Sequence, residues 1–125
     1  MSVPEFLLLV GAGGLGAGTR FVVDGLIRSR VSSAFPWPTA LINMSGSLLL
    51  GILTGLVAGD LASTETSAIL GTGFLGGYTT FSTASYEAVH LVREQKYGMA
   101  FAYGFGVLAV CIALAFAGYR WGAQA

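Results

Sequence analysis

The chain has 125 residues, of which 54% are hydrophobic and only 10% are charged, and its formal net charge is zero. Since soluble domains carry about 25% charged residues, this composition excludes a water-soluble globule, a disordered chain and a basic surface for nucleic acid. A single cysteine, Cys111, offers neither a disulfide framework nor a metal cluster. The composition therefore indicates a small, all-α integral membrane protein.

Four stretches of the sequence are apolar and long enough to cross a bilayer, which takes about 20 helical residues. They predict a single transmembrane domain over residues 1–125, with helices at about 4–27, 38–58, 66–92 and 99–121. Pro38 suits the first turn of the second helix. Ser63 is placed to cap the third helix, and Glu65 is favourable in its first turn.

The polar loops between these stretches differ in their basic residues. The first and third loops share one side of the membrane and hold Arg28, Arg30, Arg93 and Lys96, whereas the other side holds only Arg120. Because Lys and Arg favour the cytoplasmic side, we expect both of these loops in the cytoplasm and both termini outside. A subunit that inserts in two opposite orientations needs an even distribution, so this imbalance favours one orientation.

Glycines recur every fourth residue in two of the predicted helices. The repeats are Gly14 and Gly18 in the first helix, and Gly51, Gly55 and Gly59 in the second. Small residues at this spacing let helix backbones approach closely. Two interpretations fit equally well at this point: packing within one subunit, and contact between two subunits.

Charged and amide side chains within the stretches are costly, since a charge at mid-bilayer costs ~2.5–3.5 kcal/mol on insertion scales. Asp24 is expected to reach the headgroups, paired with Arg20 one turn away. Arg20 lies deeper and is interpreted as a buried cation that binds carbonyls or draws anions into a vestibule. Asn43 shares a helix face with Ser47 and Thr54, and either clasps another helix or lines a pore as a donor.

The third stretch contains Gly76-Gly77, followed by a segment with five hydroxyl side chains between Thr79 and Ser85. Adjacent glycines weaken a helix, and hydroxyl-bearing, β-branched residues after them favour a local break. Irregular backbone at membrane depth is tolerated only where protein or a water-filled cavity surrounds it. Such a break frees carbonyls for a cation and hydroxyls for an anion. A functional break is therefore favoured over a simple packing surface.

Three segments, in order, carry a family resemblance. They run from Gly13-Gly14 through Arg20-Phe21, from Pro38-Thr39 through Asn43 to Gly46-Ser47, and from Gly76-Gly77 through Thr-Thr-Phe-Ser-Thr to Glu87. In these segments the chain resembles the Fluc/CrcB family of fluoride channels. The resemblance implies an antiparallel, dual-topology dimer in the cell membrane with two narrow fluoride pores. It also implies a structural sodium ion at the dimer centre, bound by the backbone carbonyls of Gly76 and Thr79.

The same resemblance implies roles for particular side chains. The expected pore residues are Asn43, Ser47, Phe81, Ser82, Thr83 and Tyr103. Arg20, Thr39 and Glu87 are expected to have vestibule or structural roles. A pore for small, strongly hydrated fluoride must replace water with donors and with electropositive aromatic edges, such as that of Phe81.

Two positions depart from the family pattern. Ala84 stands where the motif normally ends in a second phenylalanine, and the fourth stretch has no Ser or Thr between Met99 and Ala117. A partner could supply both missing features. Together with the imbalance of basic residues, these departures favour a heterodimer with a paralogous subunit over a homodimer.

Three other function classes are less well matched. A proton-coupled small multidrug exporter needs a carboxylate deep in the first helix, but Glu5 is at its start and Asp24 near its end. An enzyme is not expected, because His90 stands alone without a nucleophile and base around it. A non-conducting structural subunit of the membrane is the third alternative.

Overall fold

The computed structural model describes residues 1–125, and the chain is all-helical, with no strand. Three helical segments are long and apolar enough to cross a membrane: α1 (Val3–Arg30), α2 (Trp37–Ala58) and the continuous segment Tyr97–Gln124. The last comprises α6 (Tyr97–Phe101), the π-helical η2 (Ala102–Gly106) and α7 (Val107–Gln124). The chain is therefore a multi-pass membrane protein.

Shorter helices lie between α2 and α6. They are α3 (Thr64–Ser67), the π-helical η1 (Ala68–Leu75), α4 (Gly76–Tyr78) and α5 (Ser82–Arg93). The Ser63 side chain accepts a hydrogen bond from the amide of Thr66 and caps α3, as its sequence position predicts. The helical backbone stops at Tyr78 and resumes at Ser82, so the residues between α4 and α5 are not helical.

Helix α1 runs further than the sequence indicates, from Val3 to Arg30 instead of ending near residue 27. Its first turn carries a capping box in which Ser2 and Glu5 bond to each other's backbone amides. At its other end, Arg28 bonds to Asp24 one turn earlier, and this pair supports the last turn. The final residues of α1 are therefore polar but still helical.

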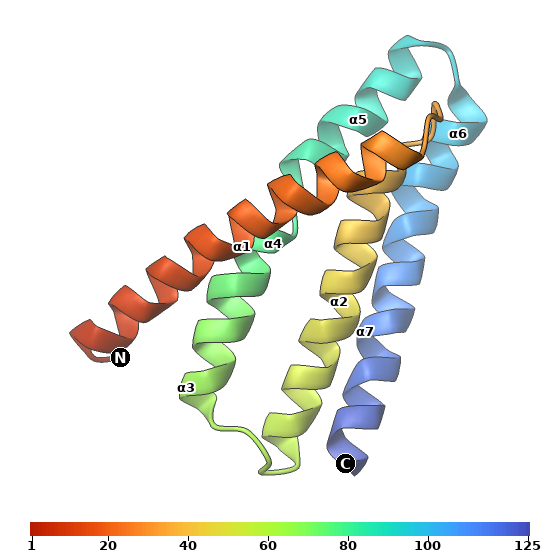
Figure 1. The fold of residues 1–125 in the computed structure, drawn as a ribbon. Helices are drawn as coiled ribbons and strands as arrows, with labels where there is room; N and C mark the ends of the chain where they lie inside the picture. The colour runs from red at the N-terminus through yellow and green to blue at the C-terminus, as the bar shows by residue number, and fades with distance from the viewer.

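Helices α2 and α7 lie side by side, and α1 crosses the column formed by α3, η1 and α4 (Figure 1). The α2–α7 approach is close, because a Cβ atom on Gly51 would lie 2.1 Å from the Ala115 carbonyl oxygen. The Gly51 and Gly55 repeat thus packs within the subunit. At Gly14 and Gly18 of α1, a Cβ atom would meet nothing within 4 Å, so this repeat packs against nothing in the chain.

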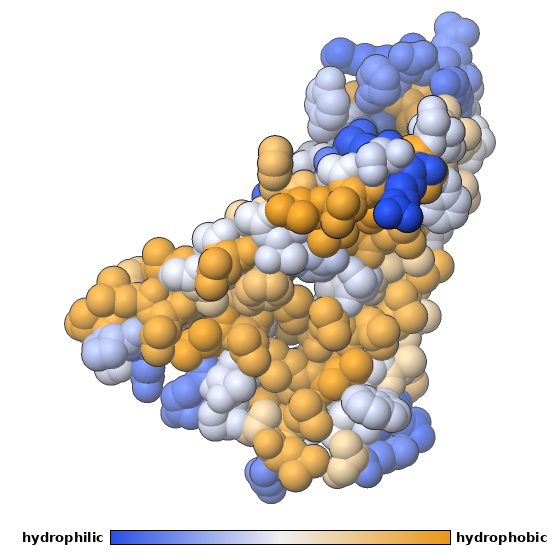
Figure 2. Space-filling model, in the orientation of Figure 1, coloured by the Kyte–Doolittle hydropathy of each residue, from blue (hydrophilic) through white to orange (hydrophobic).

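On the face shown in Figure 2, apolar side chains cover most of the surface, and polar ones gather mainly toward the two ends. Only 18 of the 125 residues are buried, so most apolar side chains face lipid or another subunit instead of a core. The C-terminal end of α1 and the turn between α5 and α6, which carry four basic residues, lie at the same end (Figure 1). The C-terminus lies at the opposite end.

Candidate functional site

The connection between α4 and α5 is the most irregular backbone within the apolar part of the chain. Thr79 is extended, with φ −82° and ψ 162°, directly after α4, which consists of Gly76, Gly77 and Tyr78. The glycines themselves stay helical and serve close packing: a Cβ on Gly77 would lie 2.1 Å from the Gly13 carbonyl oxygen in α1. The change in backbone direction therefore falls on Thr79, Thr80 and Phe81, just after the glycine pair.

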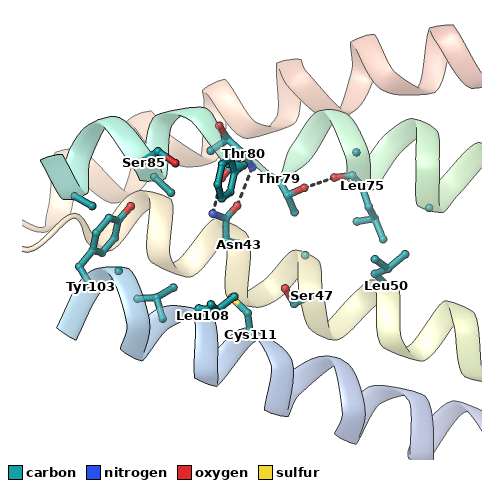
Figure 3. A pocket seen from close by; sticks show the side chains of 18 of the residues that line it. Asn43, Ser47, Leu50, Leu75, Thr79, Thr80, Ser85, Tyr103, Leu108 and Cys111 are labelled. Carbon is teal, nitrogen blue, oxygen red and sulfur yellow. Dashed lines mark hydrogen bonds between the residues drawn. The ribbon is translucent and has the colours of Figure 1, made fainter. Parts of the chain in front are cut away.

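Asn43 in α2 holds this connection with both ends of its amide. Its Oδ1 accepts a hydrogen bond of 2.8 Å from the backbone N–H of Thr80, and its Nδ2 donates one of 2.7 Å to the carbonyl of the same residue (Figure 3). The amide of Asn43 thus satisfies both the backbone N–H and the backbone carbonyl of Thr80. Of the two interpretations of Asn43, the structure shows the clasp, and the same side chain also lines a cavity.

A cavity of about 660 Å³ lies between α2, η2, α7 and the α4–α5 connection. One side, called here the polar wall, carries the polar residues Asn43, Ser47, Thr72, Thr79, Thr80 and Ser85, next to apolar residues such as Leu75 and Ala84. The facing wall, from η2 and α7, includes Gly104, Val107, Leu108 and Cys111, with Tyr103 at one end (Figure 3). Hydrogen-bonding groups therefore line one side of this cavity, opposite a mainly apolar side.

The expected pore residues are not all brought to this cavity. Asn43, Ser47, Phe81 and Tyr103 line it, together with Gly76 and Thr79. Thr83 lines a separate cavity, and Ser82 is exposed, with its hydroxyl 3.5 Å from that of Thr80. Phe81 is 86% exposed within the subunit, so one face of its ring is free for another molecule.

The second cavity, of about 280 Å³, lies between α1 and the start of α5 and includes Arg20, Thr39 and Thr83 in its lining. Arg20 makes no ion pair or hydrogen bond within the chain. The expected pairing of Asp24 with Arg20 is wrong: Asp24 binds Arg28, with 2.8 Å between Oδ2 and Nε. Both arginines are four residues away, and an acidic residue N-terminal to its basic partner is the more favourable order.

Glu87 joins four parts of the chain near the polar end of the molecule. Its Oε1 accepts hydrogen bonds from the hydroxyl of Thr39 and, at 3.4 Å, from that of Tyr103. Its Oε2 lies 3.9 Å from Nη2 of Arg28. Thr39 and Tyr103 are 2% and 3% exposed, so these contacts are shielded from solvent. Three of the expected site residues therefore form one hydrogen-bonded group.

The sequence analysis assigned no site role to four residues with polar side chains or a thiol that line the larger cavity, namely Thr72, Thr80, Ser85 and Cys111. Thr80 and Ser85 belong to the hydroxyl-rich segment, and only their partners in space distinguish them from their neighbours. Cys111 lies three residues after Leu108 and seven after Gly104, which places all three on one helix face. That spacing is the signal that could have placed its thiol in the cavity.

Comparison with known proteins decides the family. Residues 7–119 match the family described as CrcB-like protein, Camphor Resistance (CrcB). The chain belongs to this family. The match covers all the residues that line the two cavities, and it confirms the resemblance inferred from the three sequence segments.

Relatives in this family have names that state their function. "Fluoride-specific ion channel FluC 1" of Leifsonia xyli subsp. xyli is 51% identical over 104 residues, which cover 83% of this chain and 76% of the relative. "Fluoride-specific ion channel FluC" of Thermus thermophilus is 38% identical over 98% of this chain and 96% of the relative. The protein of the same name from Pyrococcus abyssi is 42% identical over 95% of this chain and 96% of the relative.

Proposed function

We propose that the chain is a subunit of a fluoride-selective channel, which lets fluoride leave the cytoplasm down its electrochemical gradient. The observation that carries the proposal is its similarity, over nearly its whole length, to relatives named fluoride-specific ion channels. Fluoride enters cells from acidic surroundings as the weak acid HF, which dissociates in the less acidic cytoplasm. A passive pathway for the anion would therefore lower its cytoplasmic concentration without an energy source.

The polar wall of the larger cavity has the donors that such an anion requires. The Nδ2 group of Asn43 carries two hydrogens, and the Thr80 carbonyl takes one of them, which leaves the other to donate to an anion. Ser47 adds a hydroxyl on the same helix face, one turn away. The positive edge of the Phe81 ring would replace further water around the ion.

The proposal includes an antiparallel dimer of four-span subunits. The third span would consist of η1, α4 and α5, broken at the connection between α4 and α5. Support comes from Phe81, which is 86% exposed although it borders the cavity, and from the many exposed apolar side chains. A second subunit would cover the Phe81 ring and complete each pore.

A structural sodium ion at the centre of this dimer is part of the proposal. The carbonyls of Gly76 and Thr79 would hold it, as the family resemblance implies. Both lie where helical hydrogen bonding ends, since Thr79 is extended, and their oxygen atoms suit a hard cation. When bound, the ion would supply positive charge that offsets part of the cost of dehydrating fluoride.

We favour a paralogous subunit over a second copy of this chain as the dimer partner. Four of the six basic residues cluster at one end of the molecule, which favours a single orientation in the membrane. Ala84 lines the larger cavity without an aromatic ring, and α7 offers the cavity no hydroxyl group. A differently oriented paralogue would provide both.

The alternative functions lack a supporting observation. A proton-coupled exporter needs a free carboxylate at membrane depth, but Glu5 is held in the N-terminal capping box and Asp24 pairs with Arg28. Reconstitution in liposomes distinguishes the three cases. A channel releases fluoride under a membrane potential alone, an exporter responds to an imposed proton gradient, and a structural subunit gives no flux.

A further inference from the structure

Two backbone amides bond to side chains here: that of Thr80 in the α4–α5 connection and that of Thr83 in the first turn of α5. In a continuous α-helix, the N–H of Thr80 would donate to the carbonyl of Gly76, and the N–H of Thr83 to the carbonyl of Thr79. Here the Thr80 N–H donates to Oδ1 of Asn43 at 2.8 Å. The Thr83 N–H donates to Oγ1 of Thr80 at 3.2 Å. Each of the two carbonyls has thus lost its helical donor to a side-chain oxygen.

These two carbonyls are the ones proposed above as cation ligands. We propose that Asn43 and the hydroxyl of Thr80 are positioning residues for that cation site: they capture the two amides and so keep both carbonyl oxygens available to the ion. This inference rests on the proposed function, because it takes the sodium site from it. It adds two residues that do not touch the ion yet set its affinity.

At each of the two sites, a side-chain oxygen and a helical carbonyl compete for one backbone amide. Without Asn43, the N–H of Thr80 would lack a partner at membrane depth, which is costly, and the Gly76 carbonyl is the helical acceptor nearest in sequence. Extending α4 by this bond would occupy one proposed ligand. Removing the Thr80 hydroxyl would act in the same way on the Thr83 amide and the Thr79 carbonyl.

Asn43 would then couple the binding of the sodium ion to the binding of fluoride in the cavity. One hydrogen of its Nδ2 group is fixed by the Thr80 carbonyl, and the other is free to face the cavity. The bonds that hold the amide in position for an anion are therefore the bonds that keep the Gly76 carbonyl free for the cation. A clasp that only stabilised the fold would leave the sodium dependence unchanged.

The test measures the thermal unfolding of the purified protein, as the assembled dimer in detergent, while sodium chloride replaces N-methylglucamine chloride at constant ionic strength. Binding to the folded state raises the melting temperature with sodium concentration, and the concentration for half of the rise reports affinity. Thr80→Val removes the hydroxyl at nearly constant volume, and Thr80→Ser keeps it. Asn43→Leu removes both hydrogen bonds of the clasp, and Ser47→Ala changes the same cavity wall without touching the connection.

We expect Thr80→Val and Asn43→Leu to shift the sodium midpoint at least tenfold upward or to abolish the response. Thr80→Ser and Ser47→Ala should keep the wild-type midpoint. If Asn43→Leu does not fold, the sodium midpoints of Thr80→Val and Thr80→Ser alone test the inference. A wild-type midpoint in Thr80→Val overturns the inference while leaving the sodium site in place. A wild-type protein whose melting temperature does not respond to sodium overturns both the inference and the proposed sodium site. Fluoride efflux from liposomes tests the channel function separately.

Discussion

Thr39, at the start of α2, donates its hydroxyl hydrogen to Oε1 of Glu87 in α5, 48 residues later in the chain. Thr39 is 2% exposed, and Tyr103 of η2 shares the same carboxylate oxygen. The helix that follows the irregular connection is thus tied to α2 and η2 through one side chain. This hydrogen-bonded group fixes α5 relative to the larger cavity.

The contact between Thr39 and Glu87 predicts a specific loss of stability. Thr39→Val replaces the hydroxyl by a methyl group of similar size and leaves the shielded carboxylate with one donor fewer. We expect the free energy of unfolding to fall by about 1.5–3 kcal/mol, the usual range for a hydrogen bond to a charged group. Thermal unfolding measures it. Thr39→Ser should stay near wild type, and an equal loss in both variants would contradict the role of the hydroxyl.

Two glycines of α1 predict opposite effects of the same substitution. A Cβ on Gly16 would lie 1.9 Å from the Phe74 carbonyl oxygen, so Gly16→Ala should force α1 away from η1 and destabilise the subunit by about 1–3 kcal/mol. Gly14→Ala meets no atom within 4 Å and should gain about 0.5–1 kcal/mol from helix propensity. Melting temperatures of the two variants test this. Equal destabilisation would show that α1 packs differently.

A substitution at Phe81 is expected to lower fluoride flux while leaving the folding of the subunit intact. Because its ring is 86% exposed in the subunit, Phe81→Leu should change the subunit's own packing little, yet lower fluoride flux at least tenfold by removing the aromatic edge from the pore. Efflux from liposomes and the melting temperature together measure this. The control is Phe101→Leu, another exposed aromatic residue that lines neither cavity. Unchanged flux in Phe81→Leu would remove Phe81 from the proposed pore.

The clustering of basic residues predicts the orientation of the subunit. Wild-type protein, expressed alone with a protease-accessible tag at its C-terminus, should insert in one orientation. The exposed Arg93 and Lys96 form no ion pair, so replacing both by Gln should allow both orientations at little cost in stability. Tag cleavage in sealed vesicles reports the ratio. Mixed orientation of the wild type, with full flux from this chain alone, would contradict the heterodimer.

Local features of the fold were predictable because neighbouring residues determine them. The cap at Ser63 and the helix start near Pro38 follow from short-range hydrogen bonding and fixed backbone angles. The partner of Asp24 was predicted wrongly: Arg20 and Arg28 are both four residues away, and only the more favourable order, with the acidic residue N-terminal to the basic one, distinguishes Arg28. The end of α1 was placed three residues early, because polarity marks where apolar residues end and not where helical hydrogen bonds end.

Four of the expected pore residues, Asn43, Ser47, Phe81 and Tyr103, line the larger cavity, but the sequence did not indicate their hydrogen-bond partners. The donors and acceptors of Asn43 indicated a costly group that needs partners, but Thr80 lies 37 residues away and no sequence spacing relates the two. The glycine pair indicated the irregular segment, although close packing against Gly13 keeps Gly77 helical. Distant pairing and packing decided both points, and only the folded chain contains that information.

Fluoride efflux from liposomes that contain the purified protein tests the proposed channel function directly. The liposomes are loaded with potassium fluoride, diluted into fluoride-free medium and made permeable to potassium, while an electrode records external fluoride. We predict rapid fluoride release without a proton gradient, from this chain alone or together with its paralogue, and no comparable release of chloride. Liposomes that retain fluoride in both cases, or that release chloride equally well, would contradict the account.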